Sequence, residues 1–209
     1  YFANNPVDKR DFKQTFYWAD KENKKISQLS DFAEDFLEKC HLSKMITKYV
    51  VQNESAQMLM VLRPYQYYAV EAIVEQVKNT EKYGYIWHTT GSGKTLTSFK
   101  TAQILTQSPH VHKVVFVVDR KDLDYQTITE FNSFSEGSVD ATNNTKKLVD
   151  QFSDDTPLIV TTLQKLNTAI SKNKYTNTME GLQDKRMVFI FDECHRSQFG
   201  DTHNRITEY

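Results

Sequence analysis

One polar segment has the residue types and spacing of a phosphate-binding loop. Residues 88–95 read His-Thr-Thr-Gly-Ser-Gly-Lys-Thr. Glycines let backbone N–H groups turn toward an anion, and the partial positive charge at the start of a following helix adds to the attraction. In this pattern Lys94 reaches the β- and γ-phosphates and the Thr95 hydroxyl binds Mg²⁺. The residues predicted to hold the nucleotide phosphates are Thr90, Gly91, Ser92, Gly93, Lys94 and Thr95.

The loop departs from the full pattern at its first position, where glycine is usual and His88 stands here. A glycine-rich turn without a ligand is therefore the alternative. The distribution of glycine argues against it. The chain has 6 glycines among 209 residues, three of them between Gly84 and Gly93, where average usage would give roughly 15 in the whole chain. Glycines this scarce are expected where the backbone needs them.

A second set of candidate residues follows an apolar run at 187–191, where the sequence continues Asp-Glu-Cys-His. Asp192 is predicted to hold Mg²⁺ through water. Glu193 is predicted to orient and deprotonate the water that attacks the γ-phosphate, so Glu193 and Lys94 are the candidate catalytic residues. The alternative is an exposed acidic turn after a strand.

Short apolar runs and helix-like stretches alternate around these residues. We expect strands at 85–87, 114–118, 158–160 and 187–191, and helices near 94–106, 122–132, 143–152 and 162–171. Continuous apolar strands separated by helices indicate an α/β protein with a parallel sheet and helices on both faces. Ligands in such folds bind at the carboxyl ends of the strands, where both candidate sets lie.

The first 62 residues follow a different pattern and are expected to form a mainly helical segment. Asp31 is a candidate helix cap with Glu34 three residues later. A one-sided apolar stripe then comprises Phe32, Phe36, Leu37 and Cys40. A second amphipathic stretch covers 42–51, an apolar run covers 58–62, and Pro64 is well placed to open a helix over 65–78.

Composition excludes several classes of protein. Lys+Arg is 26 against Asp+Glu 27, which excludes a strongly basic histone-like protein but allows locally concentrated positive charge. No apolar run reaches the roughly 20 residues that span a bilayer. Two cysteines cannot make a disulfide framework, so a cytoplasmic location is expected. The start of the chain lacks Met and a signal peptide, and we interpret the sequence as an internal segment of a longer protein.

Two residue pairs and one aromatic run have less specific interpretations. Cys40-His41 and Cys194-His195 suggest zinc, but adjacent residues rarely face one metal and no Cys-x-x-Cys spacing exists. The run at 16–18, Phe-Tyr-Trp, is either a base-stacking platform or part of the packing, and we expect packing.

Asp-Glu-x-His after a P-loop resembles motif II of superfamily-two helicases and translocases. That resemblance implies an adenine-reading role for Gln66, with Tyr65 stacked on the base, and a coupling role for His195. It also implies that Arg120, Lys121, Thr161 and Thr162 contact the DNA backbone. The alternatives are a solvated turn for Arg120 and Lys121, flanked by Asp119 and Asp122, and a helix cap for Thr161 and Thr162.

Within that group, the segments His-Thr-Thr-Gly-Ser-Gly-Lys-Thr, Val-Asp-Arg-Lys-Asp-Leu-Asp-Tyr-Gln and Asp-Glu-Cys-His-Arg-Ser-Gln together resemble the motor (restriction) subunit of type I restriction endonucleases. The resemblance covers 63–202 most strongly, and His at the first loop position is not unusual in that family. It implies an ATP- and Mg²⁺-dependent translocase on double-stranded DNA, partnered by methyltransferase and specificity subunits, with no membrane association.

The same resemblance divides the chain. Residues 63–209 correspond to a first RecA-like motor domain, and residues 1–62 to a bridge that follows an upstream nuclease domain. A second RecA-like lobe and one central strand are absent from these 209 residues, so we expect an incomplete sheet and no activity from the segment alone. Two alternatives stay open: another superfamily-two helicase or translocase of repair or remodelling, and a non-catalytic nucleotide-sensing module. The presence of Glu193 disfavours the sensing module.

Overall fold

The structure is a computed structural model that describes residues 15–118, 128–133, 140–141, 144–172, 175, 181–182 and 184–192. The chain divides into two compact units. The first comprises residues 1–104 with 133–136, and the second comprises 105–132 with 137–209. The two units divide between Ile104 and Leu105, within the helix at 94–106. The boundary expected after residue 62 separates domains of the resembled family, and it stays a prediction.

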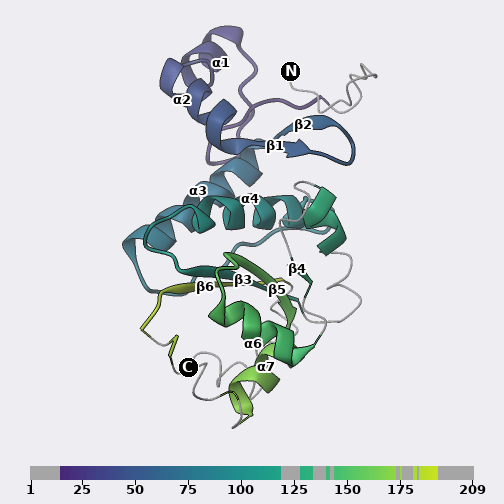
Figure 1. Cartoon of the computed structure of the whole chain (residues 1–209). Helices are drawn as coiled ribbons and strands as arrows, with labels where there is room; N and C mark the ends of the chain where they lie inside the picture. The colour runs from purple at the N-terminus through teal and green to yellow at the C-terminus, as the bar shows by residue number, and fades with distance from the viewer. Residues whose placement is uncertain are drawn as a thin grey trace. The chain divides into compact units, whose positions relative to one another are not determined.

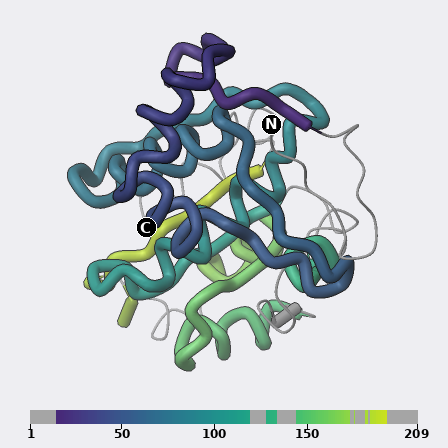
Figure 2. Tube along the Cα trace, turned by 90° about the horizontal axis from the view of Figure 1, so that it is seen from above, coloured from purple at the N-terminus to yellow at the C-terminus, as the bar shows by residue number. Residues whose placement is uncertain are grey.

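The first unit combines short helices, a hairpin and two longer helices (Figure 1). Its elements are α1 (Leu29–Asp35), α2 (Lys39–Lys44), the π-helical turn η2 (Met45–Tyr49), β1 (Val50–Asn53), β2 (Met58–Val61), α3 (Pro64–Asn79) and most of α4 (Lys94–Thr106). Strands β1 and β2 pair antiparallel, with Val50 opposite Val61, and lie side by side in both views (Figure 1 and Figure 2).

The hairpin corrects the expectation of a mainly helical first segment. The amphipathic stretch predicted over 42–51 is helical only as far as Tyr49, and the chain then becomes extended at Val50 and Val51. These β-branched residues favour a pleated strand. Gln57, with a φ of 48°, helps the chain turn back into β2. The apolar run at 58–62 is therefore the second strand of a hairpin.

Helix α1 differs from its prediction at both ends. It begins at Leu29 after Gln28, which makes no side-chain cap bond, and Asp31 lies inside the first turn instead of capping it. An acidic side chain there is favoured by the helix dipole. The predicted apolar stripe is interrupted because α1 ends at Asp35 and α2 begins at Lys39; Phe36 is buried, whereas Leu37 and Cys40 are exposed.

Trp18 is the centre of an aromatic core in the first unit. Its ring is 1% exposed and lies 4.6 Å from that of Phe36 and 5.7 Å from that of Tyr67. Its indole N–H donates to the Asp35 carboxylate at 2.8 Å. The packing role expected for the 16–18 run is confirmed for Trp18.

The predictions for α3 and α4 are confirmed. Pro64 occupies the first turn of α3, where its missing N–H costs nothing. Helix α4 covers the predicted residues 94–106.

The strand predicted at 85–87 is wrong. Residues 80–89 have no regular secondary structure, and Tyr85 and Trp87 are more than 80% exposed. A strand is stabilised by a neighbour that accepts its backbone hydrogen bonds and covers its side chains. Among the described residues no strand pairs with this segment, so its apolar composition alone does not make it a strand.

The second unit is built on a parallel sheet with the order β4-β5-β3-β6. The strands are β3 (Lys113–Val118), β4 (Asp140–Ala141), β5 (Leu158–Thr162) and β6 (Met187–Phe191), and the helices are α6 (Thr145–Ser153) and α7 (Leu163–Ser171). The strands expected at 114–118, 158–160 and 187–191 and the helices expected near 143–152 and 162–171 are confirmed. Of the helix expected over 122–132, residues 128–132 are described and are helical.

The burial of β3 and β6 agrees with their positions in the sheet. Every residue of β3 is buried, as expected for a central strand, whereas β6 is half-buried along its length at the edge of the described sheet. Helices α6 and α7 pack on one face, where Val115, Leu148 and Leu166 share a buried cluster. On the opposite face the ring of Phe131 lies 5.2 Å from that of Phe116. Among the described helices, none is long and apolar enough to cross a bilayer.

Candidate nucleotide site

The segment from His88 to Thr95, called the P-loop below, leads directly into α4. Gly91 and Gly93 have φ values of 75° and 79°, in the left-handed region that glycine tolerates best. The first hydrogen bond of α4 runs from the Thr97 N–H to the Gly93 carbonyl at 3.1 Å. The N–H groups of Lys94, Thr95 and Leu96 precede it and have no partner within a helix, which makes this end of α4 suited to an anion.

The P-loop is also held by bonds within itself. Ser92 donates to the Thr89 carbonyl twice, from its hydroxyl at 2.8 Å and from its N–H at 3.3 Å. The Thr97 hydroxyl donates to the Gly93 carbonyl at 3.1 Å. These bonds connect both ends of the glycine-rich turn to residues three or four positions away, so the turn has a defined conformation.

The first turn of α3 contacts the P-loop directly. The Tyr65 hydroxyl donates to the Ser92 carbonyl at 2.9 Å, and the Gln66 side-chain amide donates to the same carbonyl at 3.0 Å. The Gln66 carbonyl oxygen accepts from the Arg63 N–H at 2.9 Å, which completes a capping box. The structure thus brings together Tyr65, Gln66 and the P-loop.

Sequence reasoning missed the partner of these two side chains. It assigned both to a base, whereas in the structure both bond to the P-loop backbone. No periodicity or short motif connects Gln66 with Ser92, which lie 26 positions apart.

His88 lies beside this contact. Its ring centroid is 5.8 Å from that of Tyr65, with the rings nearly perpendicular. Burial and the positive charge of Lys94 lower the pKa of His88. The neutral imidazole is therefore favoured at neutral pH. His88 then adds no positive charge to that of Lys94.

The second unit places Asp192 at the carboxyl edge of its sheet. The Asp192 N–H donates to the Val117 carbonyl at 3.0 Å, which extends the β3–β6 ladder by one residue. On the other side of β3, Val118 lies opposite Thr162, the last residue of β5. Asp192 is half-buried. The prediction that this carboxylate follows directly after a parallel strand is confirmed.

Several predicted site residues lie outside the described residues, and their roles stay predictions. They are the candidate base Glu193, the coupling residue His195 and the DNA-contacting Arg120 and Lys121.

Thr161 and Thr162 are described and are fully buried. The Thr162 hydroxyl accepts from the Lys165 N–H at 3.3 Å and caps α7. The alternative role as a helix cap is therefore confirmed for Thr162, and the DNA contact proposed for both threonines stays a prediction.

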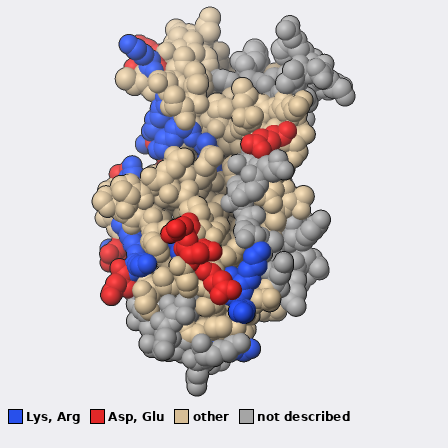
Figure 3. Space-filling view, in the orientation of Figure 1, with Lys and Arg blue, Asp and Glu red and all other residues tan. Residues whose placement is uncertain are grey.

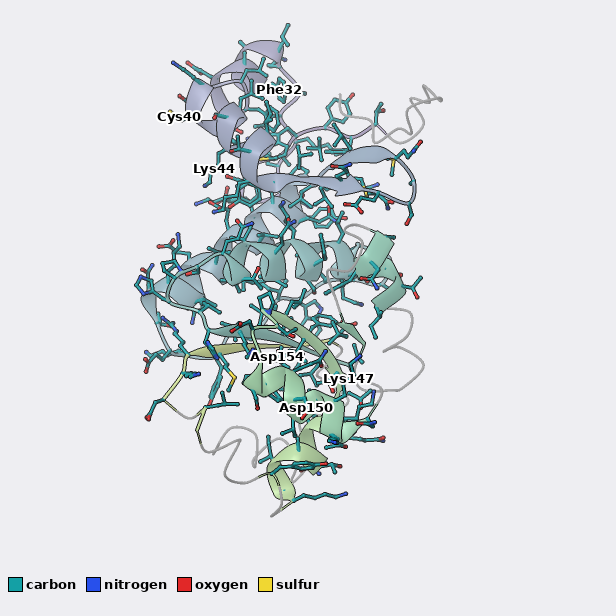
Figure 4. All side chains as sticks on the ribbon, viewed as in Figure 1. Phe32, Cys40, Lys44, Lys147, Asp150 and Asp154 are labelled. Atoms are coloured by element: carbon teal, nitrogen blue, oxygen red, sulfur yellow. The ribbon has the colours of Figure 1, made fainter. Side chains whose placement is uncertain are left out.

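The zinc interpretation of Cys40-His41 gains no support. Within the part of the chain that the structure describes, no three His, Cys, Asp or Glu side chains are grouped to hold a metal ion. The Cys40 side chain is exposed (Figure 4), and the His41 ring packs among aromatic residues, 5.5 Å from Tyr67.

Comparison with known families defines the class of this protein. Residues 65–209 match the SWI2/SNF2 ATPase family model. This match begins at the first turn of α3 and includes the P-loop and Asp192, so the bonds from Tyr65 and Gln66 to Ser92 lie within an ATPase family domain.

Similar whole proteins narrow the assignment. The endonuclease subunit of the type I restriction enzyme SsaAORF53P from Staphylococcus saprophyticus is 53% identical over all of this chain, and that of SauMSSORF170P from Staphylococcus aureus MSSA476 is also 53% identical. The C-terminal part of the putative MpnIIP endonuclease from Mycoplasma pneumoniae, also of type I, is 47% identical, with 92% of this chain and 98% of that protein covered. The chain belongs to the endonuclease subunits of type I restriction enzymes, which confirms the resemblance inferred from the motifs. It spans 22% of the length of the two staphylococcal relatives.

Proposed function

We propose that this chain is the ATP-binding part of a DNA translocase motor in a type I restriction-modification complex. The motor couples ATP hydrolysis to movement along duplex DNA before a separate nuclease domain cuts it. The observation that carries this proposal is the pair of left-handed glycines, Gly91 and Gly93, immediately before α4 in a chain that matches an ATPase family. The fold proposed for this part is RecA-like, which the parallel sheet of the second unit supports.

The P-loop supplies phosphate recognition. Backbone N–H groups from 90–95 surround the phosphates, and the Lys94 ammonium neutralises charge on the β- and γ-phosphates. Interactions of this kind strengthen as charge develops during phosphoryl transfer. Lys94 therefore contributes both to binding and to the rate of the reaction.

The chemistry of the available donors fits Mg²⁺. Thr95 offers a hydroxyl and Asp192 a carboxylate, and Mg²⁺ prefers such hard oxygen ligands while keeping several waters. When bound, the metal neutralises charge on the phosphate oxygens. In this proposal Thr95 holds the ion directly and Asp192 holds it through water.

Hydrolysis also needs a base, and Glu193 is the residue proposed to accept a proton from the attacking water. His195 is proposed to relay the state of the nucleotide to the DNA contacts. Arg120, Lys121, Thr161 and Thr162 are proposed to contact the phosphate backbone of double-stranded DNA, which would make binding independent of sequence.

The charge distribution is compatible with local DNA contacts. On the face seen in Figure 3, the coloured residues are both positive and negative, and the chain as a whole has a formal net charge of -1. We therefore propose that a DNA-binding surface on this protein consists of a few basic side chains. We propose the methyltransferase and specificity subunits of the complex as its protein partners in the cytoplasm, since DNA recognition in this family belongs to another subunit.

The proposal is tested by measuring phosphate release by the intact protein with and without duplex DNA. We expect DNA to stimulate the wild-type protein, and Glu193→Gln to bind ATP normally while hydrolysing it about 10²-fold or more slowly. The matched control is Glu81→Gln, which changes an exposed glutamate and should retain wild-type turnover. A wild-type protein that hydrolyses ATP equally with and without DNA would contradict a translocase.

A further inference from the structure

We propose that the ammonium groups of Lys44 and Lys48, on the first unit, bind a phosphate group of the backbone of duplex DNA. Neither lysine belongs to the P-loop or to the first turn of α3. The inference rests on the proposed action of this protein on DNA, and it adds a basic contact to those proposed for Arg120 and Lys121.

One carboxylate on α3 gathers side chains from α2 and η2. Glu71 accepts from the Lys44 ammonium at 2.5 Å and from the Tyr49 hydroxyl. The Lys48 ammonium lies 3.9 Å from the same carboxylate, a distance at which the two charges attract but do not form a hydrogen bond. Glu71 therefore helps to fix the positions of both lysines, and it leaves the N–H groups of Lys48 to another acceptor.

The backbone of η2 explains how these side chains meet. Its turn is π-helical, and the Val50 N–H donates to the Met45 carbonyl five positions earlier. In an α-helix, residues five positions apart point about 140° away from each other, so Lys44 and Tyr49 would not share one carboxylate. The wider turn brings both to Glu71, which holds the lysine in place before any ligand binds.

The charges in this cluster do not cancel. Burial, and next the positive charge of Lys48, lower the pKa of Lys100 on α4 to about 8, so Lys100 is still mainly charged at pH 7. The linked groups are then the carboxylate of Glu71 and three ammonium groups, those of Lys44, Lys48 and Lys100. A net positive charge remains where α2 and η2 meet α3, and it attracts an anion.

Both lysines are open to a ligand. The side chain of Lys44 is 40% exposed and that of Lys48 is 34% exposed, whereas Lys100 is buried. Figure 3 shows basic side chains gathered in the upper part of this face, and Figure 4 labels Lys44 in the same part. Two ammonium groups beside one carboxylate can therefore donate to the oxygens of one phosphate.

The chemistry of the cluster favours DNA over a protein partner. Lysine is depleted from the cores of protein interfaces, whereas it is a common donor to the phosphate groups of nucleic acids. An ammonium group binds phosphate as a point charge and reads no base. The contact is therefore independent of sequence, which suits a protein that moves along DNA.

The experiment measures binding of duplex DNA by the intact protein at pH 7 and at several salt concentrations, without nucleotide. Lys48→Gln removes one positive charge, whereas Lys48→Arg keeps it. Glu71→Gln removes the negative charge and keeps an oxygen that accepts from Lys44 and Tyr49. The matched control is Lys78→Gln, which makes the same change as Lys48→Gln at an exposed lysine near the end of α3.

We expect Lys48→Gln to weaken DNA binding about fivefold at about 0.1 M salt and to reduce the slope of log affinity against log salt by about one unit. Glu71→Gln should instead strengthen binding about threefold, because a negative charge beside the phosphate is removed. Lys48→Arg and the control should bind as the wild-type protein does. A merely structural cluster gives a different pattern, in which Lys48→Gln and Glu71→Gln both lower the melting temperature and shift DNA affinity in the same direction.

Two results would overturn the inference. One is a DNA affinity and salt slope unchanged in Lys48→Gln; poor assembly of that variant with the other subunits would then assign the cluster to a protein interface. The other is a loss of DNA affinity in Glu71→Gln equal to that in Lys48→Gln. If Glu71→Gln does not fold, Lys48→Arg decides, because a loss as large as that of Lys48→Gln would show that charge is not what matters. Failure of the wild-type protein to bind DNA at all would instead contradict the proposed function.

Discussion

The ammonium group of Lys100, on α4, donates to the backbone carbonyl of Val50, on β1, at 3.0 Å. The same ammonium donates to the Gln103 side-chain oxygen at 2.7 Å, and the Lys100 side chain is 6% exposed. Both acceptors are neutral. The contact therefore fixes the β1–β2 hairpin to the helix that follows the P-loop at the cost of burying a positive charge.

This contact predicts a pH dependence of stability. Burial, together with the charge of Lys48, lowers the pKa of Lys100 from 10.5 to about 8. Between pH 8 and 10.5 the unfolded chain keeps a proton that the folded chain has lost, so stability rises with pH across this window. We expect the free energy of unfolding to increase by about 1–2 kcal/mol between pH 7.5 and 9.5 from this residue.

The measurement is urea unfolding of the wild-type protein and Lys100→Met at both pH values. The variant lacks the titrating group, so the difference in stability between the two proteins should change with pH. The same difference at pH 7.5 and 9.5 would show that Lys100 does not titrate in this range.

Replacing Lys113 should strongly destabilise the second unit. Lys113 is 1% exposed, and its ammonium donates to the carbonyl of Asp154 at 2.5 Å and to that of Thr156 at 2.9 Å. Asp154 directly follows α6 (Figure 4). Lys113→Met would leave both carbonyls without this donor, and hydrogen bonds to charged groups contribute about 1.5–3 kcal/mol each. We expect urea unfolding to show a loss of about 3 kcal/mol.

Lys146→Met is the matched control for this change because Lys146 is exposed on α6. Its effect should be within about 0.5 kcal/mol. Equal stabilities for the two variants would mean that the Lys113 bonds add nothing to folding.

Lys94→Ala should abolish tight binding of Mg²⁺-ATP by the intact protein, because the change removes the ammonium group proposed to neutralise the β- and γ-phosphates. Binding of a fluorescent ATP analogue measures the effect. Lys82→Ala removes an exposed lysine before the loop and should bind as the wild-type protein does. An affinity of Lys94→Ala within twofold of wild type would show that Lys94 does not contact the phosphates.

Arg120→Ala should weaken DNA binding equally for unrelated sequences, since phosphate contacts carry no sequence information. The loss of one such contact should reduce the slope of log affinity against log salt by about one unit. Lys39→Ala, which removes an exposed charge on α2, is the control and should leave the slope unchanged. A loss confined to one DNA sequence would contradict the proposed backbone contact.

The sequence predicted the starts of α3 and α4 correctly. Pro64 marked the start of α3, and the glycines before Lys94 marked the start of α4, because helix ends depend on a few neighbouring residues. The left-handed turn before α4 was indicated in the same way, since Gly91 and Gly93 lie within three residues of Lys94; the binding of phosphate there stays a prediction.

The errors concern pairing between distant residues. Residues 85–87 have strand composition but no described partner strand, whereas 50–53 is a strand because β2 pairs with it. The bonds from Tyr65 and Gln66 to Ser92 depend on how α3 packs beside the loop, which composition and spacing do not encode. Motif resemblance implied a base contact for these two side chains, which stays a prediction, and gave no sign of the backbone contact that they make.

The measurement that tests the central claim most directly is displacement of a third strand from duplex DNA. A triplex-forming oligonucleotide is placed at increasing distances from the recognition site, and its release by the intact restriction complex is followed over time. We expect release only with ATP, after a delay that grows with distance. We expect none with Glu193→Gln, because this variant should bind ATP but hydrolyse it too slowly to move. Release without ATP, or with a delay independent of distance, would contradict the assignment of this chain to a DNA translocase motor.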